Sequence, residues 1–107
     1  MKFIASLAFV ATVSATLVRI TPDEKCKDIL VAPSYTKCGA NVVPPLDFFK
    51  TGAQIIHNDD GVIFYKNWRC TGEKFEVKPG PEEKQCFDLE KAGFDPVKPA
   101  CVFIVCA

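Results

Sequence analysis

The segment Cys101-Val102-Phe103-Ile104-Val105-Cys106, close to the end of the chain, decides the fold class. Between its two cysteines it is apolar and mostly β-branched, a composition typical of an extended strand. Five residue steps of about 3.3 Å then separate the two cysteines, which is too far for a disulfide between them. Each cysteine must pair elsewhere, so we expect this strand to be tied to earlier parts of the chain.

The chain of 107 residues contains six cysteines, an even number that predicts three disulfides in a short exported protein. A zinc site would need paired Cys-x2-Cys or Cys/His clusters, and the only histidine, His57, has no cysteine within 12 residues. Six cysteines allow 15 pairings, and the remaining choice stays open. The expected disulfide cysteines are Cys26, Cys38, Cys70, Cys86, Cys101 and Cys106.

Residues 1–15 have the pattern of a secretory signal peptide. Lys2 provides the positive start, an apolar run follows over residues 3–13, and Val13-Ser14-Ala15 offers small residues for cleavage. The run is about half of the roughly 20 apolar residues that span a membrane. The alternative is a buried first helix or strand. Cleavage after Ala15 would leave a single cysteine-rich domain, residues 16–107, outside the cell.

The rest of the chain consists of short apolar or alternating stretches bounded by Pro, Gly, Asn or Asp, and no long stretch keeps a helical period. Within residues 73–78, strict alternation places Phe75 and Val77 on one face. We therefore predict an all-β domain. The expected strands are residues 17–21, 28–32, 53–57, 61–66, 73–78 and 101–106.

A similar pattern occurs twice along the chain. Residues 20–33 align with residues 64–79 across a two-residue gap, and residues 47–52 match residues 88–93. We interpret this as two pseudo-repeats, about 17–58 and 61–106, joined by a turn at residues 58–61. Each repeat suggests a Greek-key-like motif, and two such motifs would pack as a small disulfide-stapled β-sandwich.

The spacing Tyr65-x4-Cys70-x-Gly72 resembles the hairpin signature of the βγ-crystallin-like family. In that signature an aromatic residue is followed after four residues by a second aromatic, and after one more residue by glycine. Tyr65 and Gly72 fit, whereas Cys70 replaces the second aromatic. The resemblance implies that Gly72 has a backbone conformation that a Cβ disfavours. The first half departs further, with Thr21 and Asp28 at the matching positions.

The chain looks like the small cysteine-rich secreted proteins of fungi that have a βγ-crystallin-like shape. This resemblance implies a non-enzymatic binding protein, effector-like or antimicrobial/toxin-like, that acts outside the cell. One alternative is an inhibitor of an extracellular hydrolase that inserts a rigid loop, such as residues 66–69 or 78–83, into its target. Others are a structural component of a cell surface or matrix, and an unrelated disulfide-rich β domain.

The residues give little support for catalysis. His57 is the sole imidazole, and its apolar neighbours place it at a strand end on the surface. The adjacent carboxylates Asp59 and Asp60, like Glu82 and Glu83, lie in turn-rich stretches that do not suggest a cleft. We therefore expect no enzyme activity and no cofactor.

A calcium site is also not expected. The family resemblance implies a site of two Asn/Asp residues, two free positions, Ser or Thr, and then Ser. Residues 58–63 have the acidic positions but carry Val62 and Ile63 where the hydroxyl groups belong. Asp59 and Asp60 are the nearest candidate ligands, and a solvated turn is the simpler interpretation.

Exposed aromatic residues remain as candidates for binding. Trp68 lies in the loop between Tyr65 and Cys70 beside Lys66 and Arg69, and Phe48-Phe49 follow a proline pair. Because Trp and Arg are favoured at interface hot spots, Lys66, Trp68 and Arg69 are the predicted binding residues. The alternative for Trp68 is a ring folded back on its own sheet.

Charge narrows the range of partners. Thirteen Lys and Arg residues balance 13 Asp and Glu residues. The chain therefore lacks the basic stripe of nucleic-acid-binding proteins and the polybasic patch of membrane-binding ones. We expect an extracellular protein or cell-surface target, with no nucleic acid and no stable membrane insertion.

Overall fold

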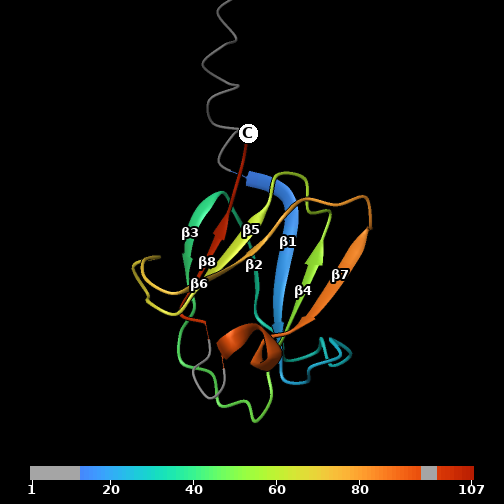
Figure 1. Ribbon diagram of the computed structural model, residues 1–107. Coiled ribbons are helices and arrows are strands. Elements are labelled where there is room, and N and C mark those ends of the chain that lie inside the picture. The colour runs from blue at the N-terminus through green and yellow to red at the C-terminus, as the bar shows by residue number, and fades with distance from the viewer. Residues whose placement is uncertain (1–12, 95–98) are drawn as a thin grey trace, which may run out of the picture.

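The computed structural model describes residues 13–94 and 99–107, which form two four-stranded antiparallel sheets (Figure 1). The predicted all-β class is confirmed. One sheet has the strand order β2-β1-β4-β7 and the other the order β3-β8-β5-β6. The strands are β1 (Val13–Thr21), β2 (Ser34–Lys37), β3 (Gly39–Val42), β4 (Gly52–Ile56), β5 (Val62–Tyr65), β6 (Lys74–Val77), β7 (Lys84–Asp88) and β8 (Cys101–Ile104), with a short helical turn η1 (Glu90–Phe94) between the last two.

Each sheet combines strands from both halves of the chain. Strand β7 completes the sheet of β1, β2 and β4, and strand β3 completes the sheet of β5, β6 and β8. The two sheets have the same strand order when β1, β2, β3 and β4 are matched with β5, β6, β7 and β8. The order β2-β1-β4-β7 then corresponds to β6-β5-β8-β3, which is the order of the second sheet read from its other edge. Because each half lends its third strand to the other, neither half can complete its sheet alone.

The core lies between the two sheets and follows the period of two that strands impose on side chains. In β1 the side chains of Val18 and Ile20 are fully buried, and in β6 Val77 is buried and Phe75 half-buried, as the alternation predicts. The Phe75 ring stacks on the Phe64 ring at 6.2 Å between centroids. The buried cluster is Val18, Ile20, Val43, Ala53, Ile55, Val62, Phe64, Val77, Leu89, Phe94, Val102 and Ile104.

The prediction of a strand over residues 28–32 is wrong, because this apolar stretch is an exposed loop. The carboxylate of Asp23 accepts hydrogen bonds from the backbone N–H groups of Lys27 and Asp28, and a turn at residues 29–32 follows. These bonds occupy backbone groups that a strand would need for a neighbour.

Three strands were missed in the sequence, namely β2, β3 and β7. All three lie at sheet edges, where one side of the strand has no neighbour. Most of their side chains are exposed or half-buried, so their sequences lack a clear apolar alternation. These three strands bury too little to require hydrophobic residues on one face, whereas β6, which is also an edge strand, buries Val77 and keeps a clear alternation.

All six cysteines form disulfides, as predicted. Cys26–Cys86 joins the loop after β1 to β7, Cys38–Cys106 joins the β2–β3 turn to the end of the chain, and Cys70–Cys101 joins the loop after β5 to β8. Cys101 and Cys106 each pair elsewhere, so the last strand is tied to two earlier segments.

Most of the predicted signal peptide, residues 1–12, lies outside the described residues. The backbone from Val13 onward belongs to β1. All five residue pairs between β1 and β4 involve residues 17–21, so cleavage after Ala15 would leave this ladder intact. Among the residues that the structure describes, no helix has the length and hydropathy needed to cross a bilayer.

Candidate binding groove beside Trp68

Trp68 lies on a tight turn between β5 and β6. The N–H of Cys70 donates to the carbonyl of Asn67 at 2.9 Å, and the N–H of Arg69 donates to the Asn67 side-chain oxygen at 2.8 Å. Cys70 has a left-handed φ of 58° and is bonded to Cys101 at the start of β8. The Cys70–Cys101 disulfide therefore anchors the turn to β8, directly after the two residues at the corner of the turn, Trp68 and Arg69.

The Trp68 side chain is 58% exposed, so its ring is not folded into its own sheet. The guanidinium carbon of Arg69 lies 4.9 Å from the ring centroid, a cation–π arrangement. This contact holds the two side chains together on the surface and leaves much of the indole accessible.

Lys66 has different neighbours from those expected. Its ammonium group forms an ion pair with the Glu73 carboxylate at 2.9 Å and lies 5.8 Å from the centroid of the Phe94 ring. The hydrogen bond and charge of Lys66 lower the pKa of Glu73. Of the three predicted binding residues, the structure therefore brings Trp68 and Arg69 together and engages Lys66 with Glu73.

An apolar groove of about 490 Å³ lies beside Trp68. The backbone segments that line the groove are held together by hydrogen bonds. The N–H of Val43 donates to the carbonyl of Ala100 at 2.8 Å, and the N–H of Ala100 donates to the carbonyl of Tyr65 at 2.9 Å. The adjacent prolines Pro44 and Pro45 have restricted backbones. The lining residues are Val42, Val43, Pro44, Pro45, Leu46, Trp68, Pro99 and Ala100.

Sequence reasoning missed this groove, although one signal was present. Residues 42–46, Val-Val-Pro-Pro-Leu, are apolar, yet the two prolines prevent them from forming a central strand. No side chain of the lining carries an oxygen, and the indole N–H of Trp68 is its only nitrogen-bearing group. Such a groove suits an apolar side chain or a proline-rich segment rather than a group that needs several hydrogen bonds.

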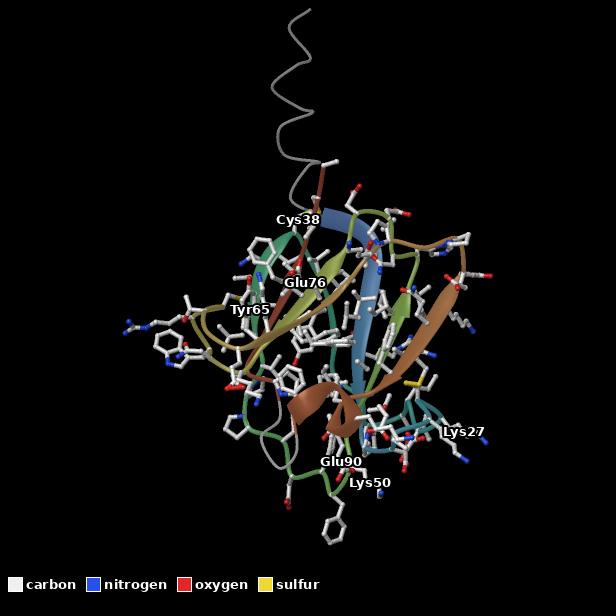
Figure 2. All side chains as sticks on the ribbon, in the orientation of Figure 1. Lys27, Cys38, Lys50, Tyr65, Glu76 and Glu90 are labelled. Atoms are coloured by element: carbon white, nitrogen blue, oxygen red, sulfur yellow. A yellow bond between two sulfur atoms is a disulfide. The ribbon has the colours of Figure 1, made fainter. Side chains whose placement is uncertain are left out.

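The residues of the hairpin signature lie around this turn. Gly72 has φ 83°, the positive value that the family resemblance implies, and no other atom lies near the position of a Cβ. Tyr65, labelled in Figure 2, is half-buried in β5 opposite Cys101 and Lys74. Gly72 therefore has a conformational rather than a steric need for glycine.

The other candidates from the sequence lie at the far end of β4. His57 is exposed directly after the strand, as predicted. The carboxylate of Asp60 accepts a hydrogen bond from the N–H of Ala107 at 3.2 Å, and the N–H of Asp59 donates to the Thr16 hydroxyl at 3.4 Å. Within residues 13–94 and 99–107, no three His, Cys, Asp or Glu side chains gather in a metal-binding group.

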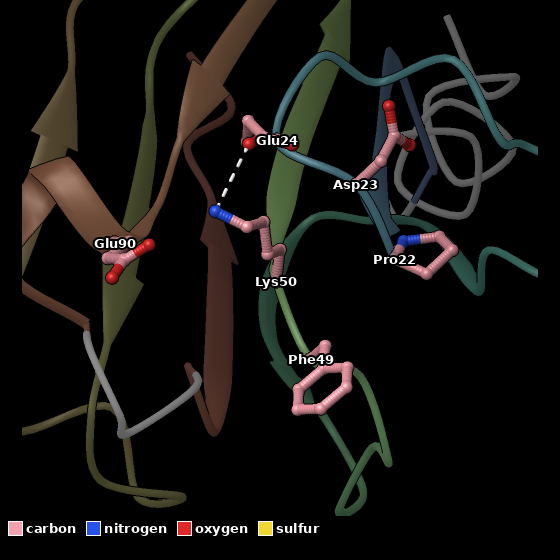
Figure 3. A pocket seen from close by; sticks show the side chains of 6 residues that line it. All are labelled: Pro22, Asp23, Glu24, Phe49, Lys50 and Glu90. Carbon is pink, nitrogen blue, oxygen red and sulfur yellow. Dashed lines mark ion pairs between the residues drawn. The ribbon is translucent and has the colours of Figure 1, made fainter.

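A second pocket, of about 560 Å³, has a different chemistry (Figure 3). Lys50 and Glu24 form an ion pair at 3.4 Å across it, and the hydrogen bond and charge of Glu24 raise the pKa of Lys50. Phe49 points away from this pair in Figure 3. The lining residues are Pro22, Asp23, Glu24, Phe49, Lys50 and Glu90.

Comparison with protein-family models, with curated proteins and with solved structures finds no match to this chain. A functional proposal therefore depends on the surface chemistry of the chain itself.

Proposed function

We propose that this chain is a secreted, non-enzymatic binding protein, effector-like or antimicrobial/toxin-like, whose groove beside Trp68 holds an extracellular protein or cell-surface target. Three disulfides in a small domain support an oxidising compartment outside the cytosol. The signal-peptide pattern of residues 1–15 points the same way.

The single observation that carries the proposal is the exposed apolar groove itself. Val42 and Trp68 on its rim are 57% and 58% exposed, although water-exposed apolar surface of this kind is costly unless a partner covers it. Arg69 stacked on Trp68 provides the pair of residue types that interface hot spots favour. The disulfide at Cys70 and the prolines at 44 and 45 limit the entropy that binding would cost.

We also propose that each half is a Greek key and that the pair is βγ-crystallin-like. In support, β4 lies beside β1 and β8 beside β5, while β3 and β7 cross to the opposite sheets. The loops after β1 and β5 contain matching turns, each closed by a cysteine N–H and each with that cysteine at positive φ, 59° for Cys26 and 58° for Cys70.

Inhibition of an extracellular hydrolase is the second candidate. This candidate is favoured because the loop of residues 66–69 is followed directly by Cys70, whose disulfide to Cys101 limits the movement of the loop. The tight turn at Asn67–Cys70 weighs against a substrate-like mode, because a substrate-like loop would be extended. Residues 78–83, the other loop considered, contain no cysteine.

The test is capture of partners by the immobilised, oxidised secreted protein, followed by affinity measurements on the captured target. We expect Trp68→Ala to weaken binding at least about tenfold, the usual effect at a hot spot. The matched control, Lys84→Ala on the exposed edge of β7, should bind like the wild type. Equal affinities of wild type and Trp68→Ala would exclude the groove as the contact surface. Stalling of one hydrolase class would favour the inhibitor.

A further inference from the structure

Two neighbouring loops, residues 22–33 and 43–51, carry four exposed large apolar side chains. Ile29 is 44%, Leu30 94%, Val31 63% and Phe49 103% exposed. The first loop begins after Thr21 and the second ends at Gly52, which are cross-strand partners in β1 and β4. Figure 2 shows Lys27 and Lys50, which mark the two loops, at one end of the molecule and Cys38 at the other.

The bases of the two loops are fixed to each other. The ion pair between Lys50 and Glu24 joins one loop to the other at 3.4 Å. Gly52 packs so closely that a Cβ there would clash with the carbonyl oxygen of Asp23. The Cys26–Cys86 disulfide ties the first loop to β7 as well. The apolar tips therefore project from a rigid base.

The tip of the first loop is itself ordered. The Asp23 carboxylate accepts hydrogen bonds from the N–H groups of Lys27 at 2.9 Å and Asp28 at 3.0 Å. The N–H of Ala32 donates to the carbonyl of Ile29 at 3.4 Å, which places Leu30 and Val31 at the corner of a turn. Leu30 is thus held outward, and little of its side chain contacts the protein.

The shape and charge of this end decide which occupant fits it. Leu30 and Phe49 are separate protrusions, and the pocket at the base of Phe49 is lined mostly by charged residues. A protein partner would need a matched cavity for each protrusion, whereas the acyl boundary of a membrane is fluid and accepts both. The two loops carry three Lys and four acidic residues, so charges of both signs border the protrusions and can pair with the phosphate and the cationic group of a zwitterionic headgroup.

We infer that these two loops dock the protein on a zwitterionic phospholipid surface, with Leu30 and Phe49 entering the boundary between headgroups and acyl chains. The interaction is peripheral and reversible, because it buries few apolar side chains and no spanning segment. It goes beyond the proposed function, since it uses a surface other than the groove beside Trp68. Loop 43–51 contributes to both surfaces, but through different residues: residues 43–46 line the groove, whereas Phe49 lies at the other end of the loop, beside Pro22 and Glu24 of the first loop.

The test uses phosphatidylcholine vesicles and tryptophan emission. Trp68 is the only tryptophan, so Trp68→Phe combined with Phe49→Trp moves the probe to the proposed docking loop. With vesicles, emission of the double variant should shift to shorter wavelength and become resistant to an aqueous quencher. Emission of the wild type, which reports on Trp68, should change less.

Vesicle co-flotation measures the contribution of each side chain. Leu30→Ser and Phe49→Ser should each lower partitioning roughly tenfold or more, the effect of withdrawing one large apolar side chain from the acyl boundary. Val42→Ser, which also replaces an exposed apolar residue but lies at the groove, should partition like the wild type. Far-ultraviolet circular dichroism checks that each variant is folded.

Three results would overturn the inference. The first is wild-type protein that fails to float with phosphatidylcholine vesicles, and the second is binding only to anionic vesicles that salt abolishes. The third is a Leu30→Ser variant that no longer binds a protein partner but still partitions to vesicles like the wild type. The first two results leave the proposed function unaffected, and the third is distinguished from its failure by a separate readout, the affinity of Trp68→Ala for the captured target.

Discussion

At the scale of single residues, three non-glycine positions within the described residues 13–94 and 99–107 have left-handed backbones, namely Cys26, His57 and Cys70. L-residues adopt this conformation only when their surroundings impose it. Cys26 and Cys70 are each held by a turn on one side and a disulfide on the other. Cross-linking thus fixes the backbone at the points where the chain leaves β1 and β5.

Gly72 provides a test at this scale. Its φ of 83° disfavours any β-branched residue, and the free space around it excludes a steric clash as the cause. We expect Gly72→Val to lower the free energy of unfolding by about 1–2 kcal/mol through backbone strain alone. Urea denaturation with the disulfides intact measures it.

Gly72→Asn is the matched control for this prediction. Asparagine tolerates the left-handed region better than other residues with a Cβ, so its loss of stability should be clearly smaller than that of valine. Equal losses for the two variants would contradict a conformational cause.

At the scale of the element, residues 22–33 show how local hydrogen bonds override strand propensity. Ile29, Leu30 and Val31 favour a strand in isolation, but the Asp23 carboxylate binds the backbone just before them. An apolar sequence that should be buried is consequently held in water. This is the most evident conflict between local propensity and observed structure in the described chain.

This arrangement predicts a pH dependence for the loop. Hydrogen bonds from the N–H groups of Asp28 and Lys27 lower the pKa of Asp23 from its ordinary value of 3.8. The stabilisation they provide is therefore fully present above pH 3.8 and is lost as the pH falls through the lower folded-state value. In an NMR titration, the amide protons of Lys27 and Asp28 should shift together with a midpoint below 3.8.

Asp23→Ala should abolish this shared titration while leaving the ladder between β1 and β4 intact, since Asp23 lies outside both strands. A midpoint above 3.8 in the unmodified protein would show that the carboxylate does not bind these amides.

At the scale of the whole molecule, the two halves depend on each other. Each sheet contains one strand from the other half, and each disulfide joins segments at least 31 residues apart in sequence. A domain of about 90 residues buries a modest core, so cross-links that each contribute about 2–4 kcal/mol are a large share of its stability.

Secretion and oxidation are tested together by intact-mass measurement. Protein recovered from the medium should begin at Thr16 and weigh six hydrogens less than the reduced chain, because all six cysteines are bonded. Reduction should restore those hydrogens and lower the unfolding temperature. Free thiols, or a chain that retains residues 1–15, would contradict the oxidised, processed form.

Composition and spacing predict the β class and the pairing of Cys101 and Cys106 with other segments, because both depend on patterns that extend over a few residues. The positive φ of Gly72 is what the resemblance at Tyr65-x4-Cys70-x-Gly72 implies. The candidate site was only partly predictable, since Trp68 and Arg69 were found but the engagement of Lys66 with Glu73 was not.

Which strands are edges, which cysteines are partners, and where apolar side chains remain in water all depend on contacts between segments far apart in the sequence. Strands β2, β3 and β7 obtain their hydrogen bonds from distant segments, so their own residues carry little signal. The groove beside Trp68 brings together residues 42–46 and 99–100, which are more than 50 positions apart. Long-range pairing creates both features, and no local pattern encodes it.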